Sequence, residues 1–346
     1  MPKNIIIKQL CVTILFLFGY HSCEAAETLG IMAFNVLREG TYKFACRPQY
    51  YIPLEKRVVA CKKAINENKP DLIGLSECTI GWVNALKDLK PYKFLTLVSV
   101  ESDSSFFKST VEINSVSDDV LNRPGTNIYA DVAFMYNSER LVPVGEIRCP
   151  HYGSPGLLSQ KFKDLKTNQE FISILIHAPW GQGMVAEYDN YHARWYQEAC
   201  NEAVKSTLPV IAMGDWNTDD VRKSGNSNGA MFDEVFNGFF DLIMPSVEFT
   251  ARWPDDSCQK TSPDHIKFYA DPSQYELKVK SINAVPEKFK HLLAHEGQSD
   301  TNNSEGAFDP LDRDNHSSDH RALIVNLEFY KKEPISNEKE SEGEQQ

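Results

Sequence analysis

A short apolar run that stops abruptly on polar residues constrains the fold of this chain most strongly. Residues 209–213 are apolar, Gly214 follows them, and Asp215 and Asn217 come directly afterwards. An apolar run bounded by turn residues predicts a buried β-strand, and glycine permits a tight turn where a Cβ would obstruct the chain. A rigid sheet could hold the two oxygen-bearing side chains steady at the end of this strand. Taken alone, however, the pattern is more often a turn than a site.

Three other apolar runs lie next to the same kind of polar side chain. Hard cations such as Mg²⁺ prefer carboxylate, carboxamide and water oxygens, and usually need one or two protein carboxylates together with substrate phosphate. Four strand ends with these side chains therefore predict one metal-dependent site built from several parts of a sheet. The polar residues are Asn35, Glu77, Asp319 and His320, which flank the apolar runs 31–34, 72–75 and 322–325.

These motifs also follow one another in a characteristic order. In chain order they are Phe34-Asn35, the PDLIGLSE stretch ending at Glu77, the strand ending at His177, the GDWN of residues 214–217, Pro263-Asp264-His265-Ile266 and the SSDH of residues 317–320. This series resembles the endonuclease/exonuclease/phosphatase superfamily, the deoxyribonuclease I-like metal-dependent phosphoesterases, over residues 29–329. Ser76 stands where many members carry Gln, and Trp216 where Phe is commoner, but neither departure removes a ligand.

The resemblance implies a fold and a metal site. The expected fold is α/β (α+β), a four-layer α/β/β/α sandwich in which two mixed β-sheets pack face to face with helices outside. The expected cofactor is Mg²⁺ (or Mn²⁺), held by Glu77 with Asn35 and Asp319 as further metal ligands. Such an ion would polarise the phosphoryl group and stabilise the leaving oxygen.

The resemblance also implies catalytic roles. Asp215 and Asn217 would place or activate the attacking water, and His177 would bind or protonate a phosphate oxygen. Asp264 would hold the tautomer of His320, which would act as general base or as proton donor. Imidazole suits this work because its ordinary pKa, about 6.5, lies near working pH. The alternatives are that His177 is structural and that Asp264 caps a turn.

Three further residues are candidates for contact with the substrate or with a catalytic histidine. Arg38 could steer a phosphate, and Trp180 could face the substrate. Glu101 lies roughly where relatives place a carboxylate that orients a catalytic histidine. For Arg38 and Glu101 a solvated loop residue is the simpler alternative, and His265, adjacent to Asp264, has no role that the sequence assigns.

The chain divides into three regions. Residues 1–26 begin with Lys3 and Lys8 and continue with an apolar run over 10–20, shorter than the roughly 20 residues that a membrane span requires. They therefore predict a cleaved secretory signal peptide and a secreted or periplasmic protein, with an uncleaved anchor as the alternative. We expect residues 27–330 to form one domain without a stable membrane span, and residues 331–346 to form a disordered acidic tail.

Charge and cysteine content bound the function further. The formal net charge is −12, and loss of residues 1–26 removes two lysines and one glutamate, which leaves −13. This acidity argues against a large basic groove for nucleic acid but does not exclude a nuclease.

The cysteines lack paired CxxC spacing, so zinc is not expected. We predict buried thiols at Cys61, Cys78 and Cys200, and disulfide candidates at Cys46, Cys149 and Cys258.

Periodicity predicts the remaining elements. A helix over 54–68 should bury Val58, Val59, Ala60 and Ile65 on one face, and residues 101–127 should form a polar surface loop. Further helices are expected over 82–89, 185–205 and 232–242, and strands over 92–100, 130–136, 141–147 and 171–177.

The sequence thus predicts a secreted Mg²⁺-dependent phosphoesterase that hydrolyses phosphodiester bonds. The favoured form is a monomeric deoxyribonuclease I-like endonuclease acting on nucleic acid. The alternatives are a phosphatase or sphingomyelinase-like phosphodiesterase acting on phospholipid or inositol phosphates, and a catalytically silent binding module on the same fold.

Overall fold

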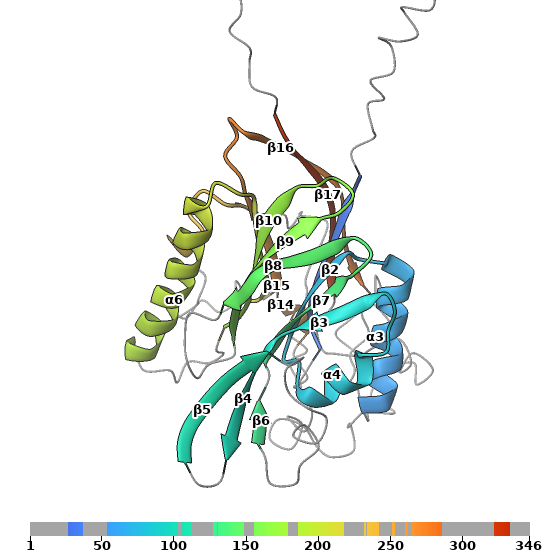
Figure 1. Ribbon diagram of the computed structural model, residues 1–346, viewed down its shortest axis with the longest axis vertical. Coiled ribbons are helices and arrows are strands. Elements are labelled where there is room, and N and C mark those ends of the chain that lie inside the picture. The colour runs from blue at the N-terminus through green and yellow to red at the C-terminus, as the bar shows by residue number, and fades with distance from the viewer. Residues whose placement is uncertain are drawn as a thin grey trace, which may run out of the picture.

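Two six-stranded β-sheets lie face to face at the centre of the molecule, with helices on the outside (Figure 1). The structure is a computed structural model, and the fold below concerns the part of the chain that it describes. The described residues are 27–36, 54–102, 105–112, 127–129, 131–148, 156–178, 186–217, 232, 234–241, 251–252, 260–261, 264–285 and 322–332.

The helices and strands have the following bounds. The helices are α3 (Leu54–Asn68), α4 (Ile80–Leu86) and α6 (Ala186–Lys205). The strands up to the middle of the chain are β1 (Leu29–Asn35), β2 (Leu72–Ser76), β3 (Tyr92–Leu95), β4 (Leu97–Ser102), β5 (Ser105–Glu112), β6 (Asn127–Tyr129), β7 (Val132–Asn137), β8 (Leu141–Arg148) and β9 (Leu157–Asp164). The later strands are β10 (Glu170–His177), β11 (Val210–Asp215), β12 (Phe240–Asp241), β13 (Ala251–Arg252), β14 (Lys260–Thr261), β15 (Asp264–Tyr269), β16 (Tyr275–Val285) and β17 (Ala322–Lys331).

Each large sheet is mixed and contains one parallel pair among its described strands. The first sheet has the order β16-β17-β1-β2-β7-β3, and its parallel pair is β1 with β2. The second has the order β12-β15-β11-β10-β9-β8, and its parallel pair is β10 with β11. Parallel neighbours end at the same edge of a sheet. The polar residues that follow each pair are therefore brought together.

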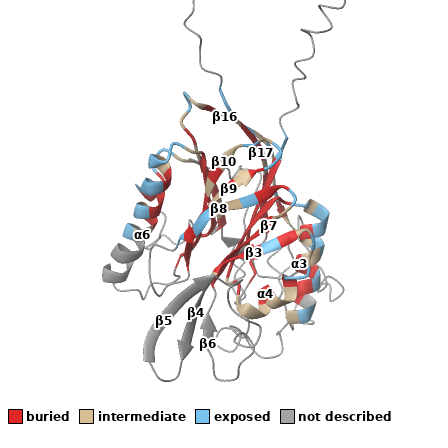
Figure 2. Cartoon of the chain, in the orientation of Figure 1, coloured by how far each residue is buried: buried red, intermediate tan, exposed pale blue. Residues whose placement is uncertain are grey.

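The inner faces of the two sheets form the central core. Ile31 and Phe134 of the first sheet and Leu175 and Ile211 of the second are fully buried in this layer. The sheets approach closely at Gly74 of β2, where a Cβ would come within 2.6 Å of the Met213 sulfur. Figure 2 shows the buried strands as the centre of the molecule, with exposed residues on the helices and at the sheet margins.

The helices cover the two outer faces. Residues of α3 and α4, such as Ile65 and Trp82, pack on Met32 and Ile73 of the first sheet. Residues of α6, such as Cys200, pack on the outer face of the second sheet. The predicted four-layer α/β/β/α sandwich is therefore confirmed.

The helix predicted over 54–68 has the expected bounds but not the expected buried face. Val58, Ala60 and Ile65 are buried, whereas Val59 is 60% exposed and the prediction for it is wrong. Because successive helical residues are about 100° apart, Val59 points away from the row formed by positions 58, 61 and 65.

The stretch after Tyr92 also differs from the prediction. The strand expected over 92–100 is divided at Thr96, whose Oγ1 donates to the Val132 carbonyl oxygen at 2.5 Å. Beyond it, β4, β5 and β6 form a three-stranded sheet where a polar loop was predicted over 101–127. Backbone hydrogen bonds pair polar strands as well as apolar ones, so composition was misleading here. Residues 113–126 lie outside the described part.

Other boundaries differ by less. The second helix begins at Ile80 and ends at Leu86, and residues 240–241 of the helix predicted over 232–242 instead form β12 beside β15. β9 and β16 were not predicted. The helix predicted over 185–205 and the strands over 130–136, 141–147 and 171–177 are present within two residues of the expected bounds.

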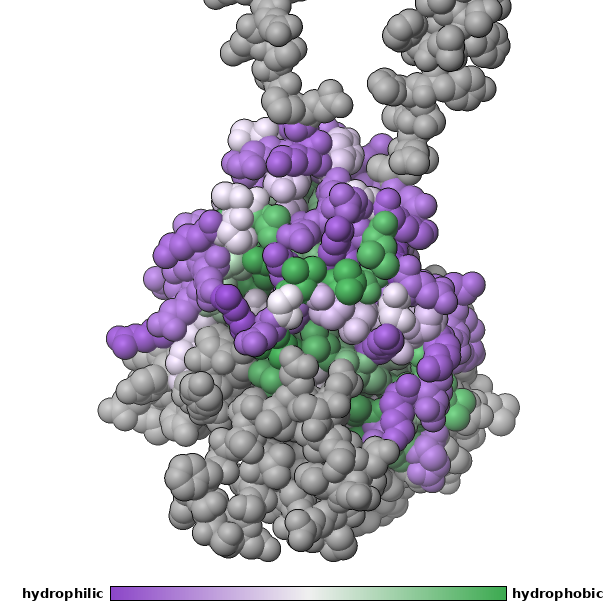
Figure 3. Space-filling model, in the orientation of Figure 1, coloured by the Kyte–Doolittle hydropathy of each residue, from purple (hydrophilic) through white to green (hydrophobic). Residues whose placement is uncertain are grey.

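The surface is largely polar, and the described cysteines agree with the sequence analysis. The described atoms in Figure 3 are mostly hydrophilic, with smaller hydrophobic areas in the middle of the face. Cys61, Cys78 and Cys200 are buried and carry no disulfide, which confirms that prediction. The other three cysteines of the mature chain, the segment 1–26 and the tail beyond 332 lie outside the described residues. No helix in the described ranges is long and apolar enough to cross a membrane.

Candidate active site

The site lies where the two parallel strand pairs end. Asn35 is the last residue of β1, and Glu77 directly follows β2, its parallel neighbour. In the second sheet His177 and Asp215 are the last residues of β10 and β11, and they are Cα partners in the parallel register. Because the sheets pack face to face, these two pairs of side chains meet at one edge of the sandwich.

Asn35 connects the two sheets through its side chain. Its Nδ2 donates to Oδ2 of Asp215 at 2.8 Å and to Oε1 of Glu77 at 3.1 Å. Asn35 and Asp215 are each only 1% exposed. A second inter-sheet hydrogen bond runs from the Asp215 backbone N–H to Ser76 Oγ at 3.3 Å. The amide nitrogen of Asn35, rather than its oxygen, therefore holds two carboxylates near each other.

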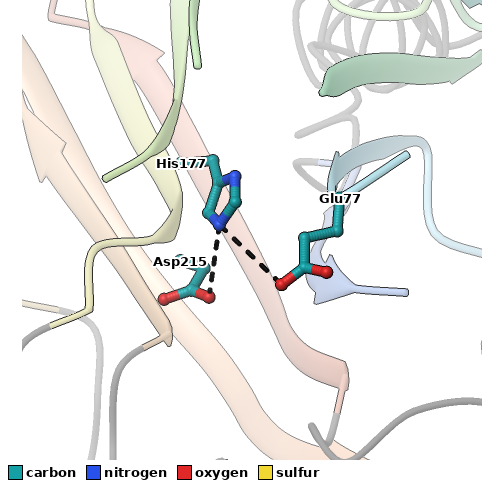
Figure 4. Close-up of side chains that lie close together, drawn as sticks. All are labelled: Glu77, His177 and Asp215. Carbon is teal, nitrogen blue, oxygen red and sulfur yellow. Dashed lines mark ion pairs between the residues drawn. The ribbon is translucent and has the colours of Figure 1, made fainter. Parts of the chain in front are cut away.

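His177 faces the same two carboxylates. Its Nε2 lies 3.9 Å from Glu77 Oε1 and 4.0 Å from Asp215 Oδ2, and Figure 4 shows the three side chains pointing toward one another. Two strands of one sheet and one turn of the other thus supply an imidazole and two carboxylates to one small volume.

Asp131 is a site residue that the sequence analysis missed. It directly precedes β7, and its Oδ2 lies 2.6 Å from His177 Nδ1. Its backbone carbonyl accepts a hydrogen bond from the Cys78 N–H, which fixes it beside the turn of Glu77. Glu101 was the residue considered for orienting a histidine, but its side chain lies outside the described part. The available signal was an aspartate at the beginning, rather than the end, of an apolar strand.

The surrounding carboxylates change the acidity of His177. Burial is the largest single influence and by itself lowers the pKa of His177, but the charge and hydrogen bond of Asp131, together with the charges of Asp215 and Glu77, outweigh it. Together these influences raise the pKa of His177 to about 9 in the metal-free protein. A protonated imidazole at this point satisfies Asp131 through Nδ1 and leaves Nε2–H directed at the other two acids.

The backbone at the site adopts conformations that L-residues rarely use. Glu77 has φ = +54° and Asn217 has φ = +49°. Non-glycine residues in this region cost free energy and cluster at functional sites. Gly214 has φ = +129°, and a Cβ there would overlap the carbonyl oxygen of Ile176 on the neighbouring strand. Glycine is therefore required where β11 leads into Asp215.

The turn after β11 is fixed by its own hydrogen bonds. The Asn217 backbone N–H donates to Asp215 Oδ1 at 2.9 Å, and its side-chain Nδ2 donates to the Ala178 carbonyl oxygen at 2.7 Å. Asp264 begins β15, is fully buried, and is the antiparallel Cα partner of Asp215. Six of the ten predicted site residues are therefore described, and all six occur at these neighbouring strand ends. Outside the described residues are Arg38, Trp180, Asp319 and His320.

The donor set fits a divalent cation. Ligand atoms of Glu77, His177 and Asp215 all lie within 4.8 Å of one another. Mg²⁺ usually takes one or two carboxylates from a protein, and Mn²⁺ shares this preference for oxygen ligands. Binding of a cation at these carboxylates would replace the positive charge that a protonated His177 supplies in its absence.

Comparison with known proteins agrees with this architecture. No protein-family model and no curated protein sequence matches the chain. Among solved structures, D. rerio TDP2 complexed with a single-strand DNA product matches with a TM-score of 0.55 and 16% identity, over 87% of this chain and 99% of that one. An endonuclease/exonuclease/phosphatase family protein from Bacteroides thetaiotaomicron matches with a TM-score of 0.54 and 15% identity, over 88% of this chain and 95% of that one. A mannosyl-6-phosphatase from the same organism matches with a TM-score of 0.53 and 17% identity, over 86% of this chain and 99% of that one. The chain therefore has the fold of the endonuclease/exonuclease/phosphatase superfamily.

Proposed function

We propose that this chain is a divalent-metal-dependent phosphoesterase. The observation that carries the proposal is the convergence of Asn35, Glu77, His177 and Asp215 from strand ends of both sheets, with Asn35 Nδ2 bonded to both carboxylates. A sandwich needs no buried acids at its edge for stability, because buried carboxylates are costly unless paired. Their concentration beside a histidine supports phosphoester chemistry assisted by a divalent cation.

The carboxylates of Glu77 and Asp215 would hold Mg²⁺ or Mn²⁺, and Asp319 would join them as the sequence motif implies. When bound, the cation polarises the phosphoryl group and stabilises charge on the leaving oxygen. Asn35 keeps the two carboxylates at a fixed separation before the cation arrives, so less reorganisation is needed on binding.

His177 would contact the substrate phosphate. Asp131 fixes its Nδ1, so Nε2 is the atom that presents a proton toward the site. From there His177 can donate a hydrogen bond, or the proton itself, to a phosphate oxygen. Asp215 and Asn217 would orient the attacking water, and His320, oriented by Asp264, would exchange a proton with it or with the phosphate.

We favour a phosphodiester of nucleic acid as the substrate and export of the protein through residues 1–26. Support comes from the motif series and from the similarity to TDP2, which was solved with a single-strand DNA product. A phosphatase or sphingomyelinase-like activity is the second candidate. The structural similarity to a mannosyl-6-phosphatase and the net charge of −12 favour it, because an acidic surface repels a polyanion.

A substrate panel tests the proposal directly. Plasmid DNA, sphingomyelin, a phosphoinositide and a sugar phosphate are incubated with the purified protein in Mg²⁺ and, in parallel, in EDTA. We expect turnover of at least one substrate, abolished by EDTA and by E77Q. The matched control is E170Q, which removes a carboxylate paired with Lys161 on the surface of the second sheet. Undiminished turnover by E77Q or in EDTA would refute the metal assignment, and no turnover of any substrate would favour the silent binding module.

A further inference from the structure

Two aromatic rings stack directly beside the acidic residues of the second sheet. Trp216 follows Asp215, and His265 follows Asp264 on the paired strand β15. Their ring centroids are 4.7 Å apart and their planes differ by 20°. Trp216 is 1% exposed. We call this contact the Trp216–His265 stack.

The stack lies on the opposite face of the sheet from the acids. Asp215 and Asp264 are antiparallel Cα partners, as are Met213 and Ile266, which belong to the core between the sheets. Side chains alternate between faces along a strand, so His265 points to the outer face. Trp216 belongs to the core beneath α6 on that outer face. The stack therefore packs against the outer face of the second sheet, opposite the acidic side chains on its inner face.

The tryptophan ring is held from several directions. Phe236 stacks on it, with ring centroids 4.3 Å apart and planes 10° from parallel. The Phe232 ring also stacks on it, with centroids 4.9 Å apart. The Lys267 ammonium lies 5.6 Å from the Trp216 ring centroid, within the range of a cation–π contact. Lys267 comes from the same face of β15 as His265. These contacts fix the Trp216 ring relative to β15.

We propose that His265 is a positioning residue for the site, and this inference rests on the proposed function. Trp216 stands between Asp215 and Asn217, so a shift of its backbone, once its ring is no longer held by the stack, would displace both. Asp215 Oδ1 also accepts the Asn217 N–H, which makes the turn move as one unit. His265 links that turn to the beginning of β15, where Asp264 lies. Its ring sets the separation of the Asp215 and Asp264 carboxylates and the place where Asp215 meets the cation.

The opposing view is that His265 only fills space in the outer core. Tyr269 provides the comparison, because it lies four residues farther along β15, on the same face, and packs on Phe239 with centroids 5.2 Å apart. Its strand partner is Val210, at the opposite end of β11 from the acids. Loss of either ring weakens the outer core. His265 stacks directly on Trp216, whereas Tyr269 reaches it through Phe239 and Phe236, so we expect loss of His265 to disturb the turn at the site and loss of Tyr269 to leave it in place.

The test compares H265A, H265F and Y269A in the full mature protein. Mn²⁺ is titrated into each EDTA-stripped protein by calorimetry, and the melting temperature, kcat and KM are recorded. Loss of groups that orient metal ligands lowers metal affinity by about tenfold to a hundredfold, and we expect such a loss in H265A. H265F keeps a ring in the stack and should restore Mn²⁺ affinity, whereas Y269A should lower the melting temperature with Mn²⁺ affinity unchanged.

Two results separate this inference from the proposed function. Failure of the unsubstituted protein to bind Mn²⁺ or to hydrolyse any phosphoester would remove the proposed function and, with it, this inference. Normal Mn²⁺ binding and turnover by the unsubstituted protein, with equal Mn²⁺ affinities in H265A and Y269A, would overturn the positioning role alone. Failure of H265F to restore affinity would also overturn it, because the ring would then not be the effective group.

Discussion

Replacement of Asp131 by Asn should lower the pKa of His177 and loosen the orientation of its ring. Asp131 Oδ2 lies 2.6 Å from His177 Nδ1, and its charge and hydrogen bond are the main influences that raise the pKa of this histidine. D131N keeps the shape of the side chain but removes its charge. Burial of the imidazole, which lowers the pKa of His177, is then opposed only by Glu77 and Asp215 at about 4 Å.

The size of the effect follows from the contact. A hydrogen bond to a charged group contributes about 1.5–3 kcal/mol, and one pKa unit corresponds to about 1.4 kcal/mol, so the pKa of His177 should fall by about one to two units. The pKa of about 9 in the metal-free protein would then come to about 7–8. Phosphoester turnover at neutral pH should fall about tenfold to a hundredfold, because Nε2 is less firmly oriented once the charged partner of Nδ1 is lost.

Nuclear magnetic resonance titration of the histidine ring signals in EDTA-treated protein measures this pKa, and the spectrum of H177N assigns the signal. The matched control is D164N, which neutralises another buried aspartate, held by Arg140 Nη2 at 3.1 Å. D164N should destabilise the protein without moving the pKa of His177. An unchanged pKa in D131N, or equal shifts in the two variants, would refute the role given to Asp131.

Three further predictions concern the scaffold and the pH dependence. R140M should lower the free energy of unfolding by about 3–5 kcal/mol in urea titrations, because Arg140 pairs with two buried aspartates that would be left without their cation, while Mn²⁺ affinity stays unchanged. G214A should destabilise by at least about 1–3 kcal/mol and also weaken Mn²⁺ binding, because its Cβ meets the Ile176 carbonyl oxygen; a stable, fully binding G214A would contradict this. In EDTA the raised pKa of His177 stabilises the protein below about pH 6.5, and this contribution is lost as pH rises toward about 9. Urea titrations from pH 6 to 9.5 should therefore show a fall in unfolding free energy that is absent in H177N.

The candidate site was largely predictable from sequence because its residues end apolar strands. Asn35, Glu77, His177 and Asp215 each close a run whose composition identifies it as buried, and the sheet brings such ends together. Asp131 was missed because it lies in none of the motifs of the series and meets His177 only through tertiary contact. In an antiparallel neighbour the beginning of one strand lies beside the end of the next, which only the pairing of β2 with β7 reveals.

The fold shows the same division between local and tertiary information. The helix over 54–68 was predicted with correct bounds because its pattern is local, but Val59 was placed on the wrong face. The polar strands β4 and β5 were read as a loop because pairing between neighbours, and not hydrophobic composition, makes them strands. The stacking of Trp216 on His265 required the register of β11 and β15, which residue spacing does not contain.

The central claim is that one divalent cation binds between the ends of the two parallel strand pairs. Crystals of the mature protein grown with Mn²⁺, measured at the manganese absorption edge, test it most directly. The account predicts an anomalous difference peak about 2.0–2.6 Å from carboxylate oxygens of Glu77 and Asp215. The peak should be absent from crystals of E77Q grown in the same way. A peak elsewhere in the molecule, or one that persists between these strand ends in E77Q, would contradict the account.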